Sequence, residues 1–377
     1  MRRVHHIPAQ ASPSVSPNTT PGPVSSAGPA VAGAPAVAVD ALETGRLRVS
    51  ELNEHRRVRW PGHGCAKDVG WMQKCQPPTT DATAEFVQLD AAVKSGENVL
   101  PSDAKDYVYL IVGGLFTGLW PRGLYLHQNL EALKSAGLDA RRASIDTDQS
   151  VEHNAAIIRK SVLAATASGK KVVLIGHSEG GLHAAAALAL YPELKGNVRA
   201  LVTIQAPLGG SPIASDLEEV PGLEAVAGKV LDLIGGSILS WSEMDYESRR
   251  EFMAQHPMPP GIPTVCMASS KRSLLAPLYA AGKYIKSRYG VDSDGLVIPE
   301  DAFLPGSRTV MLAGLDHADT TVTKIYPFPP YRPRDLTLAL VGLALREPTQ
   351  TSRDEMEGPQ RKNAAKLVDP GRAPQHL

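Results

Sequence analysis

The feature that most constrains the fold of this chain is one serine between a strand-like and a helix-like segment. Residues 171–175 read KVVLI, a continuous apolar run typical of a buried parallel strand. Residues 176–180 (GHSEG) follow at once, and the sequence up to Leu190 is rich in Ala and Leu. The G-x-S-x-G pattern alone is common by chance, but a strand before it and a helix after it are what a nucleophile elbow requires. We therefore expect Ser178 at a sharp strand–turn–helix corner.

The two glycines of this pattern have a steric reason. Ser178 must occupy a strained turn with its hydroxyl projecting, and glycine at positions 176 and 180 lets the strand and helix backbones approach closely. A glycine-rich phosphate loop or an ordinary turn leaves the small residues on both sides of one serine unexplained. The pattern thus favours a nucleophile.

Strand-like and helix-like segments alternate through the rest of the chain, which is typical of a parallel sheet covered by helices. Ser150 is the expected N-cap of the second helix. We predict an α/β fold with a mostly parallel central sheet and helices on both faces. The expected strands cover residues 106–112, 140–145, 171–175, 198–204, 262–267 and 309–313, and the expected helices cover residues 124–136, 151–167, the segment ending at 190, 274–287 and 334–345.

The two ends of the chain differ from this body. Residues 1–39 contain seven Pro, five Ser and no Asp or Glu, so they cannot bury a core. We expect residues 1–44 to be a disordered leader, residues 45–104 a helical and loop extension, and residues 105–346 the α/β domain. Residues 347–377 are expected to form a disordered polar tail.

Charge and apolar content exclude some classes of partner. The 39 Lys and Arg residues balance 39 Asp and Glu, whereas a nucleic-acid binder needs a basic excess. No apolar run reaches the ~20 residues of a transmembrane helix. Cys65, Cys75 and Cys266 fit no zinc or disulfide framework, although the first two could also form a local disulfide instead of remaining thiols.

A serine nucleophile needs a base, and the base needs an orienting acid. In an α/β fold with an elbow, the acid and then the histidine follow the serine along the chain. His317 directly follows the last expected strand, and we predict that it is the base. The alternatives are less well placed, since His183 lies in the elbow helix, His256 in a polar loop and His376 in the tail.

The predicted acid is Asp294, in the segment SDGLV at residues 293–297. Gly295 in the turn lets the carboxylate point inward, and Leu296 and Val297 anchor the loop. Asp292 and Asp301 are the alternatives, because Asp is also frequent in turns for its local backbone hydrogen bonds.

Two main-chain N–H groups are needed to stabilise a developing oxyanion. One is expected from Glu179, directly after the nucleophile. The other is expected from Leu115, which follows a glycine pair at the end of the strand over residues 106–112. The glycine pair could also be a simple turn.

Together these segments resemble the α/β-hydrolase superfamily, and within it bacterial true (triacylglycerol) lipases and a set of plant α/β-hydrolase proteins. The resemblance covers roughly residues 105–345. It implies a lipase- or esterase-like serine hydrolase of hydrophobic carboxylic esters that needs no cofactor, with Ser178, Asp294 and His317 as its triad. The segments that carry it are residues 109–115 (YLIVGGL), 175–181 (IGHSEGG), 203–216 (TIQAPLGGSPIASD), 293–297 (SDGLV) and 315–317 (LDH).

The chain departs from the lipase pattern in two places. Gly113 stands where the lipase strand usually has His, which alters the side-chain support of that loop. Bacterial lipases of this type often hold a structural calcium near the catalytic histidine, and Asp319 falls where one ligand would be. No matching carboxylate lies upstream of Asp294, and hard cations take six or more oxygens. We therefore expect no metal and interpret Asp319 as a loop cap.

Residues 206–260 form a long insertion between two expected strands. Within it, residues 220–234 place apolar side chains near helical spacing, and Gly235-Gly236 follow. This helix is interpreted either as a lid over the serine, with transient membrane-surface contact, or as a helix packed permanently on the core.

Further alternatives stay open. The same triad would serve a thioesterase or an acyltransferase, and a non-catalytic α/β-hydrolase that binds a ligand or protein is the alternative from another class. The presence of all three triad candidates favours an enzyme.

The acid-free leader has no Sec-type apolar stretch and resembles the start of bacterial type III secreted effectors, so the protein is expected to be either cytoplasmic or exported into a host cell. A passive tail is the alternative for the leader.

Overall fold

The structure is a computed structural model. The residues that it describes are 68–114, 124–146, 148–216, 242–272, 278–322 and 329–346. The expected leader and tail, the helix expected at residues 220–234 and the expected oxyanion donor Leu115 lie outside these ranges. Within them, no helix combines the length and apolar character needed to cross a membrane.

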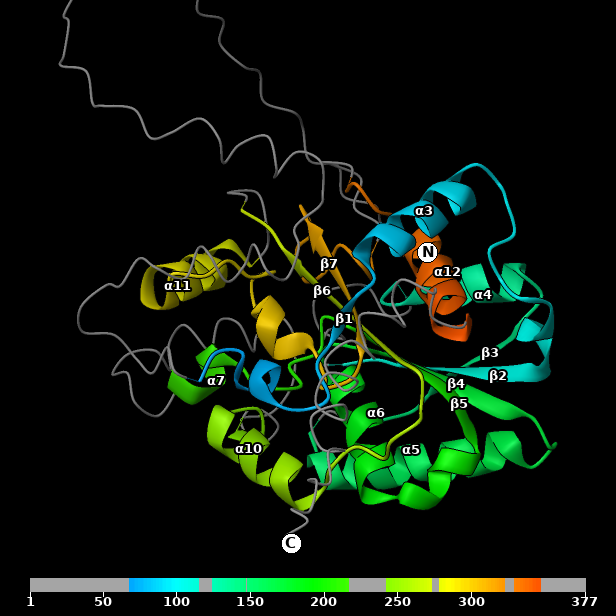
Figure 1. Cartoon of the computed structure of the whole chain (residues 1–377), viewed down its shortest axis with the longest axis horizontal. Helices are drawn as coiled ribbons and strands as arrows, with labels where there is room; N and C mark the ends of the chain where they lie inside the picture. Colours follow the sequence, from blue (N-terminus) through cyan, green and yellow to red (C-terminus); the bar gives the residue numbers. More distant parts are fainter. Residues whose placement is uncertain are drawn as a thin grey trace, which may run out of the picture. The chain divides into compact units, whose positions relative to one another are not determined.

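A seven-stranded sheet forms the centre of the described chain, and every neighbouring pair of its strands is parallel (Figure 1). Because the carboxyl ends of parallel strands lie at one edge of the sheet, the loops that follow the central strands meet there. In spatial order the strands are β1 (Thr80–Asp81), β7 (Arg308–Ala313), β6 (Thr264–Ser270), β5 (Val198–Ile204), β4 (Lys171–His177), β2 (Tyr107–Val112) and β3 (Asp139–Ala143).

The strands at the centre of the sheet are buried on both faces, which explains their continuous apolar sequences. In β4 every residue except Lys171 is buried, and in β2 every residue except Tyr107. All six strands expected from the sequence are present, and their ends differ from the expected ones by at most three residues. The predicted fold class is therefore confirmed.

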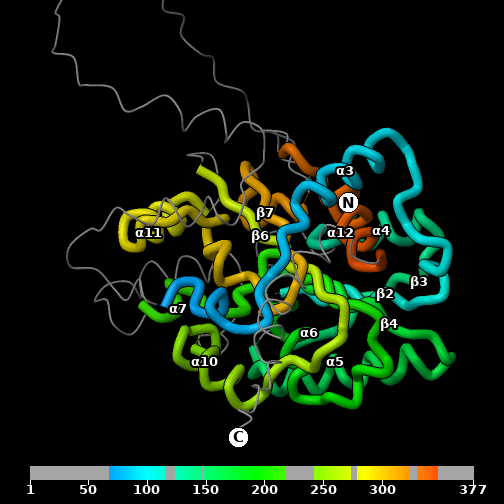
Figure 2. Tube along the Cα trace, in the orientation of Figure 1, coloured from blue at the N-terminus to red at the C-terminus, as the bar shows by residue number. Residues whose placement is uncertain are grey.

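Helices cover both faces of the sheet (Figures 1 and 2). Ser150 caps the second expected helix as predicted, because its side-chain oxygen accepts a hydrogen bond from the N–H of His153. On one face lie α5 (Val151–Thr166) and α6 (Glu179–Leu190), and on the other lie α3 (Thr83–Lys94), α4 (His127–Ser135) and α12 (Pro333–Leu345).

Short helices occupy the connections. The insertion between β5 and β6 contains α7 (Pro212–Asp216) and α10 (Tyr246–Gln255) in its described part. Between β6 and β7 lies α11 (Tyr279–Tyr289), where the sequence predicted a helix over residues 274–287. The 3-10 helices are η3 (Trp71–Lys74), η4 (Ser102–Asp106), η5 (Pro192–Gly196) and η6 (Pro299–Ala302).

The described part of the N-terminal extension joins the sheet and its helix layer. Strand β1 pairs with β7, and α3 packs on α12 and β7. The fully buried side chain of Asp301 holds this segment: one carboxylate oxygen accepts the N–H of Gly70 at 2.7 Å and the other accepts the hydroxyl of Tyr246 at 2.7 Å. Asp301, an alternative for the acid, thus links the extension to α10.

Candidate active site

The expected strand–turn–helix corner is present around Ser178. Strand β4 ends at His177, α6 begins at Glu179, and Ser178 between them has φ 56° and ψ −134°. A positive φ is strained for a residue with a side chain, and strained residues persist only where the surrounding structure holds them. The N–H of Ser178 donates to the carbonyl of Ile204 at 2.9 Å, which ties the corner to β5.

Two glycines make this corner sterically possible. A Cβ atom at Gly176 would lie 2.4 Å from Cα of Gly181, so β4 and α6 are in direct backbone contact there. A Cβ atom at Gly180 would lie 2.4 Å from the carbonyl oxygen of Gly113. Gly180 therefore makes room for the end of β2. From the sequence we expected this glycine to let the strand and the helix of the elbow approach each other.

Three side chains predicted from the sequence meet at the carboxyl edge of the sheet. Nε2 of His317 lies 2.8 Å from Oγ of Ser178, and Nδ1 lies 2.7 Å from a carboxylate oxygen of Asp294. The histidine is 0% exposed, the aspartate 2% and the serine 7%. With the Nδ1 proton directed at the carboxylate, Nε2 can accept the proton of the serine hydroxyl.

The carboxylate of Asp294 is fixed by further donors. Its second oxygen accepts the main-chain N–H groups of Leu296 at 2.9 Å and Val297 at 2.8 Å. The main-chain carbonyl of Asp294 accepts the N–H of His317 at 2.9 Å. The loop with the aspartate and the loop with the histidine are thus joined through both side chain and backbone.

The alternative acid Asp292 has other partners. It forms ion pairs with Arg272 and, at 3.3 Å, with Lys286. Burial raises the pKa of Asp292, but the two cations outweigh burial and the pKa lies below its ordinary value.

The alternative histidines lie elsewhere. His183 is fully buried in α6, and burial together with the charge of Arg249 lowers its pKa to about 3. His256 ends α10 with its ring against Phe252. His376 falls outside the described residues.

The structure describes part of the expected oxyanion site. Glu179 is the first residue of α6, where main-chain N–H groups have no acceptor within the helix. The neighbouring loop is described up to Gly114, whose N–H donates to the hydroxyl of Tyr125 at 2.8 Å. Leu115, the expected second donor, lies just beyond it.

A buried polar network beneath the three residues was not found from the sequence. Tyr125 accepts from Gly114 N–H, and its hydroxyl lies 2.8 Å from Nδ1 of His177. Nε2 of His177 lies 3.0 Å from the carbonyl oxygen of His317. Burial, and then the charge of His317, lowers the pKa of His177 well below its ordinary value. A neutral ring with its proton on Nε2 satisfies both contacts, since Tyr125 donates to Nδ1 and Nε2 donates to the carbonyl.

Gln205 extends this network from the end of β5. It has a positive φ of 50°, and its side-chain nitrogen donates to Ser269 at 2.6 Å and to the carbonyl of Asp316 at 3.2 Å. Its side-chain oxygen accepts from Thr320 at 2.6 Å. Gln205 therefore links Asp316 and Thr320, which lie on either side of His317, to the ends of β5 and β6.

Asp319, interpreted from the sequence as a loop cap, accepts the N–H of Asp316 at 2.9 Å. The same oxygen lies 2.6 Å from Nζ of Lys271, so an ammonium group balances its charge.

In the part of the chain that the structure describes, no group of three or more His, Cys, Asp or Glu side chains is arranged to hold a metal. The described cysteines, Cys75 and Cys266, are free.

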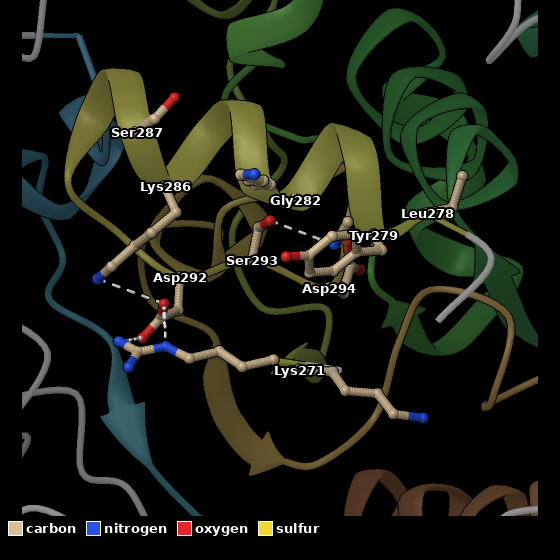
Figure 3. Close-up of a pocket in the computed structure, with 12 residues that line it drawn as sticks. Lys271, Leu278, Tyr279, Gly282, Lys286, Ser287, Asp292, Ser293 and Asp294 are labelled. Carbon is tan, nitrogen blue, oxygen red and sulfur yellow. Dashed lines mark hydrogen bonds and ion pairs between the residues drawn. The ribbon is translucent and has the colours of Figure 1, made fainter. Parts of the chain in front are cut away.

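A cavity of about 320 Å³ lies between α11 and the loop that carries Asp294 (Figure 3). Lys271 and Arg272 line it from the end of β6, and Lys283 and Lys286 line it from α11. Asp294 is among its lining residues, whereas Ser178 is not.

Comparisons with known proteins agree with this architecture. The sequence model of one family, described as PGAP1-like alpha/beta domain, matches residues 146–226. No curated protein sequence matches the chain.

Similar folds are found among solved structures. A metagenomic carboxyl esterase is 18% identical and aligns over 79% of this chain and 99% of its own, with a TM-score of 0.55. A Bacillus licheniformis lipase in mature form is 22% identical over 58% of this chain and 86% of its own, with a TM-score of 0.49. A Staphylococcus hyicus lipase is 15% identical over 71% and 99%, with a TM-score of 0.44. The similarity to the esterase shows that the chain has the α/β-hydrolase fold.

Proposed function

We propose that this chain, which has the α/β-hydrolase fold, is a serine hydrolase of carboxylic esters with hydrophobic acyl groups. The observation that carries the proposal is the line of contacts from Ser178 through His317 to Asp294, with distances of 2.8 Å and 2.7 Å. A serine hydroxyl is a weak nucleophile, and this geometry supplies both the base and the group that orients it.

In the first half of the reaction, Oγ of Ser178 attacks the acyl carbonyl carbon and its proton moves to Nε2 of His317. Asp294 retains the hydrogen bond to Nδ1 and stabilises the imidazolium that forms. The N–H groups of Glu179 and Leu115 stabilise the negative oxygen. The ester C–O bond then breaks, and Nε2 returns the proton to the leaving alcohol.

In the second half, water attacks the acyl group on Ser178. Nε2 of His317 takes a proton from the water, and the carbon–oxygen bond to the serine breaks. The proton moves from Nε2 to Oγ, the carboxylic acid leaves and the free enzyme is regenerated.

The hydrophobic class of substrate is supported by the lipase-like segments of the sequence and by the apolar residues that the sequence places near helical spacing at positions 220–234. The names of similar structures, a carboxyl esterase and two lipases, point to the same kind of bond. These features support a lipase or an esterase.

The test is hydrolysis of p-nitrophenyl esters from acetate to palmitate by the wild type and Ser178→Ala. We expect the variant to lose ~10⁶-fold in kcat, down to the background rate. Ser168→Ala, at an exposed serine after α5, is the matched control and keeps full activity. The preferred chain length separates an esterase from a lipase. A folded wild type that cleaves none of the esters would replace the proposal with acyl transfer, thioester hydrolysis or ligand binding.

Export through a type III system into a host cell is a separate part of the proposal. It is supported by the composition of residues 1–39, which lack Asp and Glu and are rich in Pro and Ser. Residues 1–50 fused to a translocation reporter test it. A reporter that stays in secretion-competent bacteria counts against export and leaves the esterase proposal intact.

A further inference from the structure

We propose that Lys271 is a positioning residue for His317, which it holds by binding the aspartates on both sides of the histidine. The catalytic meaning of this role rests on the function proposed above. Lys271 forms its hydrogen bonds with Asp316, Asp319 and Ser293, and not with Ser178 or His317. Its effect would therefore pass through the loop that carries the histidine.

The ammonium of Lys271 lies between two carboxylates. Nζ is 2.6 Å from Oδ2 of Asp319 and 3.5 Å from Oδ2 of Asp316. The aspartate side chains are 0% and 1% exposed, and the lysine side chain is 12% exposed. Buried carboxylates need a partner charge or hydrogen bonds, because water no longer solvates them. Lys271 supplies that charge at both positions.

The same carboxylates define the backbone around His317. Oδ1 of Asp316 accepts the N–H groups of Ala318 at 2.9 Å and Asp319 at 3.1 Å. Oδ2 of Asp319 accepts the N–H of Asp316 at 2.9 Å. The turn over residues 316–319 is therefore closed by two side chains that bind one ammonium.

Lys271 also holds the loop with the candidate acid. Its main-chain N–H donates to the carbonyl of Ser293, directly before Asp294, at 3.0 Å. Because Lys271 directly follows β6, it connects the sheet to the acid loop through its backbone and to the histidine loop through its side chain. The two loops that must bring Asp294 and His317 together are thus anchored on one residue.

Lys271 and the other paired cations of the cavity bind different carboxylates. Arg272 and Lys286 pair with Asp292, and in Figure 3 the side chain of Lys271 extends away from that group. Burial lowers the pKa of Lys271, but Asp319 and Asp316 outweigh burial, so the pKa lies above its ordinary value. The ammonium therefore remains charged at neutral pH.

The experiment compares Lys271→Met, which keeps the length of the chain and removes the charge, with Lys271→Arg, which keeps the charge. We expect kcat of Lys271→Met to fall ~10- to 100-fold with KM within twofold, because small displacements of a catalytic base have effects of this size. Lys271→Arg should recover most of kcat. Lys283→Met is the matched control, since this lysine lines the same cavity from α11.

A readout that does not depend on turnover separates this proposal from the proposed function. The low-field proton NMR signal of the His317–Asp294 hydrogen bond reports the geometry of that bond. In Lys271→Met the signal should weaken, because the turn that carries His317 loses a group that holds it in place.

Each outcome supports or overturns one proposal. An inert wild type with a signal that changes in Lys271→Met would reject ester hydrolysis and support positioning. An active wild type whose kcat and NMR signal are the same in Lys271→Met would overturn the role of Lys271. If Lys271→Met does not fold, the double variant with Asp319→Asn balances the charges. In that folded double variant, a His317–Asp294 signal and kcat close to wild type would support the pairing of Lys271 with Asp319, and a kcat still ~10- to 100-fold lower would overturn it.

Discussion

The ring of His177 donates a hydrogen bond from Nε2 to the main-chain carbonyl of His317, at a distance of 3.0 Å. The two rings lie 4.8 Å apart between centroids. The residue before the candidate nucleophile thus supports the backbone of the candidate base. Through Tyr125, the same ring is linked to the N–H of Gly114 at the start of the expected oxyanion loop. One neutral imidazole therefore connects three parts of the site.

Tyr125→Phe should lower kcat about tenfold and leave KM unchanged, since losing ~1.4 kcal/mol of transition-state stabilisation corresponds to that factor. The variant removes the acceptor for Gly114 and the donor to His177. Ester kinetics measure the effect. Tyr109→Phe is the control, because its buried hydroxyl donates to Ala104 at 2.7 Å, away from the site. Equal kcat values in the two variants would refute the role of this network.

Asp294→Asn and Asp301→Ala should separate the candidate acid from the structural aspartate. We expect Asp294→Asn to lower kcat ~10⁴-fold while the protein stays folded, because the imidazole loses its orienting carboxylate. Asp301→Ala leaves the N–H of Gly70 and the hydroxyl of Tyr246 without this partner, so the free energy of unfolding should fall by about 1–3 kcal/mol with kcat unchanged. Kinetics and urea denaturation measure the two effects. The opposite pattern would exchange the two assignments.

Gly180→Ala should abolish activity and strongly destabilise the fold. The new methyl group would lie 2.4 Å from the carbonyl oxygen of Gly113, so α6 and the end of β2 would have to separate. Gly196→Ala is the control, because its Cβ would meet no atom within 4 Å and its free energy of unfolding should change by less than about 0.5 kcal/mol. Thermal denaturation by circular dichroism compares them. Similar melting temperatures would contradict the contact.

His183 should make the fold less stable in acid. Burial and the charge of Arg249 lower its pKa from 6.5 to about 3 in the folded state. Between these values the unfolded state binds more protons, so the free energy of unfolding falls as pH falls. From pH 8 to pH 5 this residue should account for a loss of about 2 kcal/mol. Urea denaturation at both pH values measures this effect. The fall in the free energy of unfolding between pH 8 and pH 5 should be smaller in His183→Leu than in the wild type by that amount. Equal losses in wild type and variant would refute this account.

The elements that the sequence predicted well are those with a strong local pattern. The continuous apolar run before Ser178 identified β4, and similar runs identified the other long strands. Strand β1 has two residues, Thr80 and Asp81, and was missed because so short a strand has no period. Helix α10 (Tyr246–Gln255) was also missed, since it buries only Tyr246 and Arg249 and so lacks an apolar stripe.

The part of the candidate site that the sequence predicted also depends on strong local patterns. Ser178 and His317 follow recognisable strands, so their loops had to reach the carboxyl edge of the sheet. The sequence favoured Asp294 as the partner of His317, but it gave no sign that Asp301 holds Gly70 and Tyr246. Tyr125 lies 52 residues before His177 and carries no local sign of their contact.

By itself, the sequence determined the order of strands and helices, the corner at Ser178 and the edge at which the site would form, because these follow from the local spacing of apolar residues and glycine. Only the tertiary structure decided what Asp301 holds, which backbone Gly180 accommodates and where the charge of Lys271 acts. The physical reason is that these are short-range contacts between residues far apart in the chain. Their distances depend on how the loops pack, and no local pattern contains that information.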